Sequence, residues 1–294
     1  MANVPKIHAR SAGFIVDDLR RRRLAVDKLL QEVGLEKAGL SDPENRVPQT
    51  PVFHLMERAA SLTGDASYGL RLGASVDPGN RGLLGFIALN SPTLIEAMAN
   101  IQRFYKVGRE GHDCEIERFG PQVAFRFRIA DPALRGLRHT SEYLAATVVR
   151  GCRDLTCQSI SPIRVEFIHD EPDERVEYFK FLGCPVKFGA EWDAVIYAEE
   201  TTRLPVKGAD TKLLEVLEAH LSEASGAHSQ GARSRSRGPP SHHRKAANGL
   251  GQPQPNCQTA GCEQQDLGAP AGATRRKLQH PVGPDTVQCS DTLP

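Results

Sequence analysis

The chain has 294 residues, with 37 Lys and Arg against 36 Asp and Glu, so its formal net charge is only +1 at pH 7. This balance excludes a strongly basic nucleic-acid coat and an acidic solvating tail. The apolar runs fall short of the roughly 20 residues that cross a bilayer, and the N-terminus lacks the apolar core of a secretory signal. We expect a soluble, cytoplasmic protein with no membrane partner, whose seven cysteines are free thiols.

Aromatic residues divide the chain unevenly. All of them lie at or before Tyr197, and no Phe, Tyr, Trp, Ile or Met follows Ser222. A segment without large apolar side chains cannot bury enough surface to offset its conformational entropy. We therefore predict an N-terminal extension over residues 1–19, a folded domain over residues 20–221 and a disordered tail over residues 222–294.

The first part of the domain has apolar residues at helical spacing. A helix is predicted from Leu24 to Val33, ended by Gly34, and a second helix over residues 50–62. The basic run at residues 20–23 is interpreted as a solvated helix start, the alternative being a phosphate-binding arm.

The most apolar stretch, residues 82–105, is divided by Ser91-Pro92-Thr93 into two helical parts. Ser91 is predicted to cap the second part, with Pro92 at its first position. Residues 79–85 are rich in glycine, but no strand precedes them and no Lys follows, so they are interpreted as a loop before a buried helix rather than a phosphate loop.

From His112 onward apolar and polar residues alternate, which predicts strands over residues 114–117 and 123–129 with a turn at Gly120-Pro121. Arg126 and Arg128 are expected on a solvated face of the second strand. The later predicted elements are a helix over 139–157, a strand over 163–168, a helix over 174–182, strands over 186–188 and 194–197, and a helix over 210–220. The predicted fold class is α+β, with N-terminal helices followed by a mostly antiparallel sheet with interleaved helices.

Catalytic motifs are absent from the sequence. It has no G-x-S-x-G, H-E-x-x-H or G-x-x-x-x-G-K pattern. Cys152 and Cys157 have the wrong gap for a redox C-x-x-C pair, and Cys114 and Cys184 are isolated. We predict no catalytic residue and no cofactor.

Two polar groups resemble metal sites only superficially. The first comprises His242, His243, Cys257 and Cys262, which lack zinc-ligand spacing and lie in the predicted tail. The second comprises Glu166, His169, Asp170 and Glu171, interpreted as a surface turn before Pro172 rather than a metal or acid–base site. We predict no metal.

Seven segments, in this order and spacing, resemble the N-terminal domain of AraC-type bacterial transcriptional regulators, of the arabinose-binding-domain class. They are LLQEVGL (29–35), DPENRVP (42–48), ERAASLTGDASYGLRLG (57–73), GLLGFIALNSPTLIEAM (82–98), SEYLAATVVRGCRDLT (141–156), PIRVEFIHDEP (162–172) and the stretch 181–221. The resemblance implies a domain that binds a small-molecule effector and forms homodimers. It also implies a following pair of helix-turn-helix units that contact DNA.

The resemblance implies a mostly apolar effector pocket with a few polar anchors. The aromatic residues that could line it, each with an ordinary core position as the alternative, are Phe86, Phe104, Tyr105, Tyr143 and Trp192. No quoted motif identifies the effector or its contact residues.

The helix-turn-helix units expected after Leu221 are missing from the tail, which holds mainly Gly, Pro, Ser, Arg, Gln and Ala. Codons able to encode residues 258–286, read one nucleotide later, permit a string that resembles the first helix-turn-helix of an AraC-type DNA-binding domain. Residues 263–265, for example, permit Ser-Ser-Arg, and residues 277–279 permit Ser-Phe-Ser. We hypothesise a frameshift between Ser222 and Gln258, so that DNA is a partner only of a version with the frame intact.

Several alternatives stay open at this point. The tail is otherwise a natural disordered linker whose Arg233, Arg235 and Arg237 touch phosphate weakly. The domain is otherwise an enzyme with an α+β pocket that uses Cys or His chemistry, or an interaction module that dimerises without a ligand.

Overall fold

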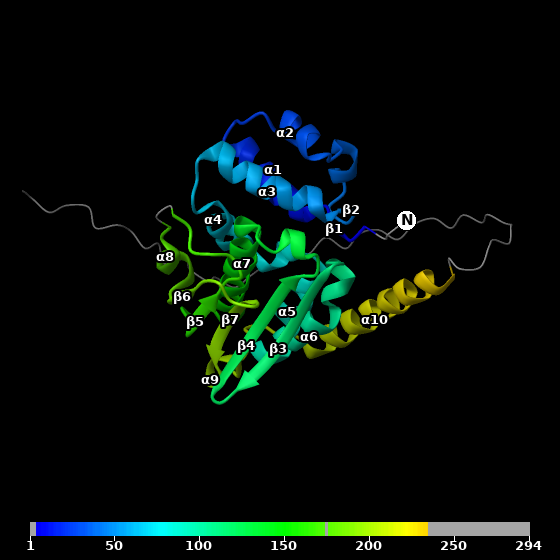
Figure 1. The fold of residues 1–294 in the computed structure, drawn as a ribbon. Helices are drawn as coiled ribbons and strands as arrows, with labels where there is room; N and C mark the ends of the chain where they lie inside the picture. The colour runs from blue at the N-terminus through cyan, green and yellow to red at the C-terminus, as the bar shows by residue number, and fades with distance from the viewer. Residues whose placement is uncertain (1–3, 174–175, 235–294) are drawn as a thin grey trace, which may run out of the picture. The chain divides into compact units, whose positions relative to one another are not determined.

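The computed structural model describes residues 4–173 and 176–234. In chain order the elements are β1 (Lys6–His8), α1 (Arg10–Arg21), α2 (Val26–Val33), η1 (Lys37–Leu40), β2 (Arg46–Pro48), α3 (Gln49–Thr63), α4 (Tyr68–Ser75), η2 (Pro78–Arg81), α5 (Leu83–Asn90), α6 (Leu94–Gly108), β3 (His112–Phe119), β4 (Gln122–Ile129), η3 (Pro132–Leu134), α7 (Arg138–Thr156), β5 (Arg164–Glu166), α8 (Tyr178–Leu182), β6 (Val186–Lys187), β7 (Asp193–Ala198), α9 (Glu199–Thr202) and α10 (Thr211–Ser234). Figure 1 shows helices α1 to α3 gathered on one side of the long helix α7 and the main sheet on the other.

The main sheet has five strands in the order β3-β4-β7-β5-β6. All neighbours are antiparallel except β5 and β6, which are parallel. A separate pair, β1 and β2, is antiparallel. The predicted α+β class with a mostly antiparallel sheet is confirmed.

Alternation along β4 gives the sheet two different faces. Val123, Phe125 and Phe127 are buried on the face that α7 covers through its contact with β7. Arg126 and Arg128 lie on the opposite face, where they pair with Glu117 and Asp113 of β3. This half-covered sheet fits the expectation that the two arginines belong to a partly solvated face.

Several predicted helices form within a few residues of their expected bounds. Gly34 and Gly64 adopt left-handed φ values of 76° and 60° and end α2 and α3, which a glycine does at least cost. The predicted cap of α6 is wrong, because Thr93, not Ser91, accepts a hydrogen bond from the Glu96 backbone N–H. Ser91 instead donates to the Ile87 carbonyl at the end of α5.

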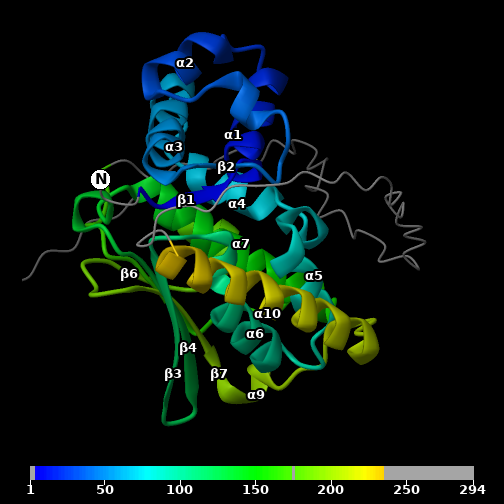
Figure 2. The same ribbon diagram turned by 90° about the vertical axis from the view of Figure 1, so that its right-hand side faces the viewer.

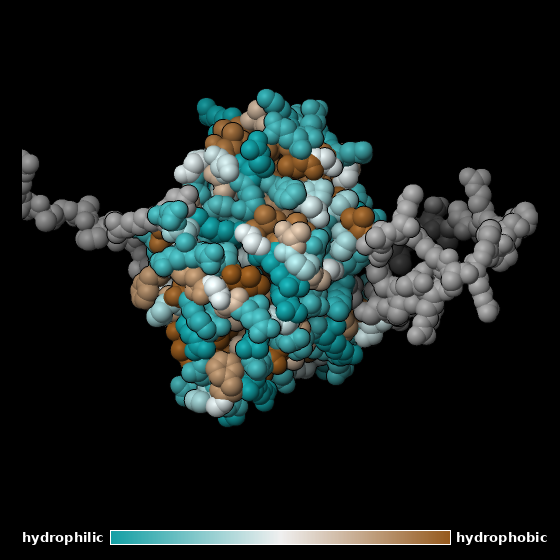
Figure 3. Space-filling view, viewed as in Figure 1, coloured by the Kyte–Doolittle hydropathy of each residue, from teal (hydrophilic) through white to brown (hydrophobic). Residues whose placement is uncertain are grey.

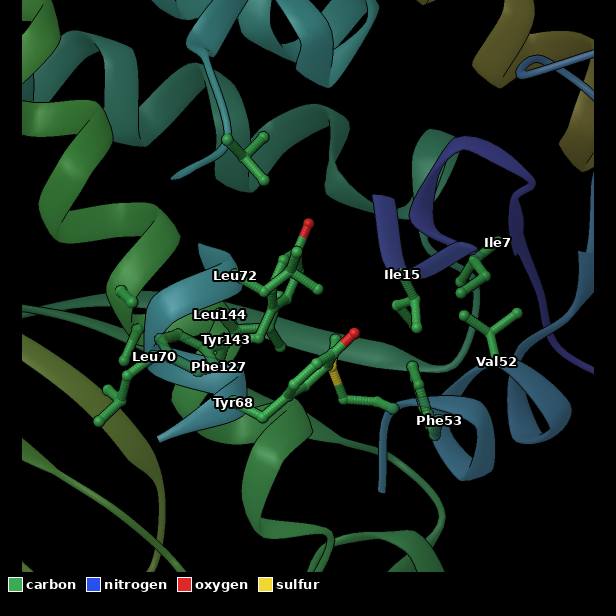
Figure 4. Packing of buried hydrophobic residues seen from close by; sticks show 14 of the residues in the cluster. Ile7, Ile15, Val52, Phe53, Tyr68, Leu70, Leu72, Phe127, Tyr143 and Leu144 are labelled. Atoms are coloured by element: carbon green, nitrogen blue, oxygen red, sulfur yellow. The ribbon is translucent and has the colours of Figure 1, made fainter. Parts of the chain in front are cut away.

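Residues assigned to an N-terminal extension form β1 and α1. Ile7, Ile15 and Leu19 are completely buried in the main core, part of which Figure 4 shows from close by. No helix was predicted over residues 10–21, although the apolar residues of α1 have helical spacing. The basic run therefore lies at the end of a helix instead of starting one, since Arg20 and Arg21 form part of the last turn of α1.

Helix α4 packs against α7 at very short range. A Cβ atom at Gly69 would collide with the backbone carbonyl of His139, and one at Gly73 with that of Tyr143. The two glycines lie one helical turn apart and therefore on one face of α4. Only glycine allows the two helix backbones to approach this closely.

The last described helix, α10, lies across α5 and α6 (Figure 2). Leu214 and Leu221 on α10 pack with Ile87 and Phe104 in a small second core. Helix α10 continues to Ser234, beyond the start predicted for the tail, and the rest of the predicted tail lies outside the described residues.

The surface in Figure 3 is mostly hydrophilic, with apolar residues in small separate patches. Scattered apolar residues of this kind are ordinary for a protein surface. Within residues 4–173 and 176–234, no helix combines the length and the apolar character needed to cross a membrane.

Candidate functional site

A cavity of about 150 Å³ lies within the main core, between α1, α5, α6, α7 and β4. The α6 side contributes Ala97, Met98 and Ile101, whose spacing places them on one helical face. Strand β4 contributes Phe125 and Phe127 through the period-two alternation that buries this face of the sheet. The walls are therefore mainly apolar and come from both halves of the domain.

Basic side chains interrupt these apolar walls. His8, Arg10, Arg81 and Arg109 line the cavity, and no Asp or Glu among the described residues does. Arg10 is paired with Glu44 and donates from Nη1 to the Asn80 carbonyl oxygen at 3.2 Å. The cavity thus carries an excess of positive charge.

Arg81 and Arg109 differ from Arg10 in their partners. Arg81 donates from Nη2 to the Val76 carbonyl oxygen at 3.0 Å, and its Nε is buried without a hydrogen-bond partner. No ion pair found in the described part of the chain involves Arg81 or Arg109. A guanidinium in such surroundings normally has a carboxylate or phosphate beside it.

The charges of both arginines influence the pKa of Tyr143. Burial raises the pKa of Tyr143, while the charges of Arg109 and Arg81 both oppose that rise. Burial also raises the pKa of Tyr105 to about 12, again opposed by Arg109. Both phenols are therefore neutral hydrogen-bond donors in the cavity wall at pH 7.

His8 is also neutral. Burial, followed by the charges of Arg46, Arg10 and Arg109, lowers the pKa of His8 to about 4. Its Nδ1 lies 3.2 Å from the Glu44 carbonyl oxygen. His8 therefore offers a neutral imidazole at the basic end of the cavity.

Glycines make room for two of the arginines. A Cβ atom at Gly151 on α7 would collide with Nη1 of Arg81. At Gly82, with φ of 69°, a Cβ atom would lie 2.8 Å from the guanidinium carbon of Arg10. Each arginine thus lies against backbone that carries no side chain.

Of the five aromatic residues considered from sequence, the structure places Tyr105 and Tyr143 in the cavity wall. Phe86 is 42% exposed on α5, and Phe104 is buried against α10. The ring centroid of Trp192 lies 3.9 Å from the guanidinium carbon of Arg128, on the sheet face opposite the cavity. Sequence reasoning missed the arginines because no local pattern distinguishes them from surface arginines.

The polar group after β5 does not converge on a site. Glu166 pairs with Arg164 at 2.8 Å, while Asp170 and Glu171 are exposed. His169 is buried, stacks on Phe167, and has Nδ1 2.8 Å from the Asp170 carbonyl oxygen. Among the described residues no cluster of His, Cys, Asp or Glu could hold a metal ion, and His242, His243, Cys257 and Cys262 lie outside them.

Cys114, Cys152 and Cys184 are free thiols. Cys152 lines the cavity, and burial raises its pKa to about 11. Burial likewise raises the pKa of Cys184 to about 11 and that of Cys114 to about 12. These thiols are protonated near neutral pH, and a nucleophilic cysteine needs the thiolate.

The family described as "Arabinose-binding domain of AraC transcription regulator, N-term" matches residues 24–206. The ornithine utilization regulator of Pseudomonas aeruginosa is 22% identical over 179 residues, which cover 61% of this chain and 53% of that protein. The crystal structure of the transcriptional regulator CdpR from Pseudomonas aeruginosa aligns with a TM-score of 0.46 and 16% identity, over 67% of this chain and 64% of that one. The chain thus spans about half the length of the curated relative it matches.

Proposed function

Because the chain belongs to the arabinose-binding-domain family of AraC transcription regulators, we propose that it is the effector-sensing part of a bacterial regulator and that its cavity holds the effector. The single observation that carries this proposal is the mainly apolar cavity with a few polar side chains inside the matched domain. We place the protein in the cytoplasm, where a regulator of transcription meets its DNA.

An enzyme of Cys or His chemistry finds no support at this cavity. The Cys152 thiol is held protonated by burial, and the nearby His8 has a pKa of about 4. General acid–base chemistry works best with a pKa near the operating pH. Ligand binding without turnover is the role that these groups support.

The effector proposal is tested by screening small molecules for a rise in the melting temperature of the full chain, because a ligand of the native state stabilises it. Val148→Trp on α7 and Ile101→Trp on α6 each put a large side chain into the cavity. A hit should lose its effect in both variants, and Leu62→Trp on an exposed site should keep it. Hits that are insensitive to both cavity variants would place the effector elsewhere.

Ornithine, the compound in the name of the Pseudomonas relative, is a useful negative arm of that screen. Beside its carboxylate it carries two ammonium groups, and the described residues of the cavity lining offer no carboxylate to pair with them. We expect no rise in melting temperature with ornithine. Tight binding of ornithine that Val148→Trp abolishes would contradict the proposed charge of the site.

Homodimerisation through α10 is the second part of the proposal. Leu213 and Val216 on this helix are 45% and 65% exposed, while Leu214 and Leu221 face the domain. Apolar residues at i and i+3 on an otherwise solvated helix suit a helix–helix contact. Leu213→Glu with Val216→Glu should convert a dimer to a monomer in analytical ultracentrifugation, and Ile163→Glu, exposed on the sheet side, should not. A wild-type protein that stays monomeric at high concentration would refute the proposed dimer.

The third part concerns DNA. Tail residues 258–286 permit an AraC-like helix-turn-helix in the next reading frame, which supports a frameshift after Ser222. We propose that the chain as written lacks specific DNA binding and that a frame-restored chain has it. Resequencing the gene, with a DNA mobility shift on both proteins, tests this. Operator capture by the chain as written, or no single-base change that restores a helix-turn-helix, would refute it.

A further inference from the structure

Among the described residues the lining of the cavity includes basic side chains and no acid, although Asp154 and Asp77, outside the lining, act on Arg81 through their charges. Arg81 and Arg109 line the cavity without an ion-pair partner, while Arg10 is paired with Glu44 at its edge. Elsewhere in the domain, Arg71 is paired with Asp18 and Asp65, and Arg153 donates to three backbone carbonyls. Among the described residues, Arg81 has one carbonyl acceptor and no ion pair.

An unpaired guanidinium among apolar side chains is costly, because burial removes water without supplying a counter-charge. Burial indeed lowers the pKa of Arg81. A bound anion would supply that charge and would accept from donors now without partners, above all Nε of Arg81. The hydroxyl of Tyr143, which also lines the cavity and has a hydrogen bond with Thr147, is a further polar group of the wall.

The remaining walls define the rest of the ligand. Met98, Ile101, Phe125 and Phe127 present apolar surface around the space beyond the arginines. A volume of about 150 Å³ is on the scale that holds one small ring, as in engineered apolar cavities that take up benzene. In the described part of the chain, no acidic side chain lines the space to receive a cationic group.

Building on the proposed effector site, we infer that the ligand is a compact monocarboxylate, with its carboxylate on the Arg81 guanidinium near Arg109 and Tyr143 and its apolar body between α6, α7 and β4. Arg81 provides the fork that a carboxylate accepts from two nitrogens. Arg109 adds charge, and the phenol of Tyr143 adds an uncharged donor. A neutral or cationic ligand of the same shape leaves the arginines unpaired.

The test uses sets of nearly equal shape and different charge on the full chain. Benzoate, benzamide and benzamidine form one set, and hexanoate with hexanamide and cyclohexanecarboxylate with its amide form two others. In calorimetric titrations we expect at least one carboxylate to bind about tenfold or more tighter than its amide, and benzamidine not to bind. Equal affinities for acid and amide, tighter binding of benzamidine, or no binding by any carboxylate would overturn the inference.

Variants locate the effect at the arginine. Arg81→Met should weaken the carboxylate about tenfold or more and leave the amide unchanged. Arg81→Lys keeps the charge but loses the fork, so an intermediate affinity is expected, which a folding defect would not give. Arg118→Met, on an exposed strand position, is the matched control. Unchanged carboxylate binding in Arg81→Met would also overturn the inference.

The same data separate this inference from the proposed function. If amides bind as well as acids and Val148→Trp abolishes both, the cavity is the effector site and only its preference for acids is wrong. If Val148→Trp and Ile101→Trp leave every bound compound unaffected, the proposed effector site fails together with the inference.

Discussion

Two regions of the domain bury charge in opposite ways. Around α1, the buried Asp18 accepts from Arg22 and Arg71, each at 3.1 Å, and Arg71 also donates to Asp65 at 2.8 Å. In the cavity, Arg81 and Arg109 lie among apolar side chains with no acid in the lining. We call the first set of charges the closed network, because its members pair with one another, and Arg81 and Arg109 the open pair, because no acid lies in the described lining beside them.

This difference distinguishes a structural network from a binding site. The closed network connects α1 to the start of α4, and every charge in it has a partner within the chain. Arg81 and Arg109 have no such partner among the described residues. Their burial is therefore offset only when a ligand supplies a negative charge. Asp193 provides a third case, a buried carboxylate that accepts only from neutral donors, Ser141 Oγ and the Ile168 N–H.

The largest expected effect comes from breaking the closed network. Asp18→Asn keeps the shape of the side chain but leaves Arg22 and Arg71 with Asp65 as their one shared acid, which should lower the free energy of unfolding by about 3 kcal/mol. Urea denaturation measures this change. Asp17→Asn, next to it on the exposed side of α1, should change stability by less than about 0.5 kcal/mol. A loss no greater than that of the control would show that the network is not structural.

The next effect concerns the buried carboxylate without a cation. Burial raises the pKa of Asp193 to about 6, so the native state holds this proton where the unfolded state has released it. The free energy of unfolding should therefore fall as the pH rises from about 4 to 6. Asp193→Asn can still accept from the Ile168 N–H and can donate from Nδ2 to Ser141 Oγ, and it should stabilise the protein at pH 7 by about 2 kcal/mol. The plots of unfolding free energy against pH for wild type and Asp193→Asn should converge near pH 4. Parallel plots would show that the pKa of Asp193 is not raised in the native state.

A smaller effect is expected when the open charge is removed without ligand. Arg81→Met deletes a buried charge that has no acid partner, at the cost of one hydrogen bond to the Val76 carbonyl. These opposing contributions should keep the free energy of unfolding within about 1 kcal/mol of wild type. Urea denaturation of the ligand-free protein checks it. A loss as large as that of Asp18→Asn would make Arg81 a structural residue.

The smallest stability effect is expected from moving Arg81 instead of removing it. Gly151→Ala places a methyl group where Nη1 of Arg81 lies, and the flexible guanidinium can shift away. Because Ala favours the helix by up to about 1 kcal/mol, stability should change little, while carboxylate affinity falls several-fold. Gly13→Ala, in α1 with open space around it, should leave affinity unchanged. Equal carboxylate affinities in Gly151→Ala and Gly13→Ala would show that Gly151 does not position Arg81 for binding.

The position of Arg81 also shows how far sequence patterns reach into the site. Tyr105 and Tyr143 were within reach because aromatic residues in apolar stretches are candidates for any pocket wall. Arg10, Arg81 and Arg109 come from three separate segments, and nothing in their neighbours indicates that they meet. Long-range packing brings them together, and local periodicity carries no information about it.

Helices α2, α3 and α7 and the strand pair β3–β4 were determined by the sequence itself, because the period of their apolar residues fixes both the element and its buried face. The formation of helix α4 depends on its packing in the folded protein. Gly69 and Gly73 lower its helix propensity, yet they allow its backbone to contact α7. The same long-range packing sets unpaired arginines around an apolar space, since a side chain's partners depend on which distant segments share its surroundings.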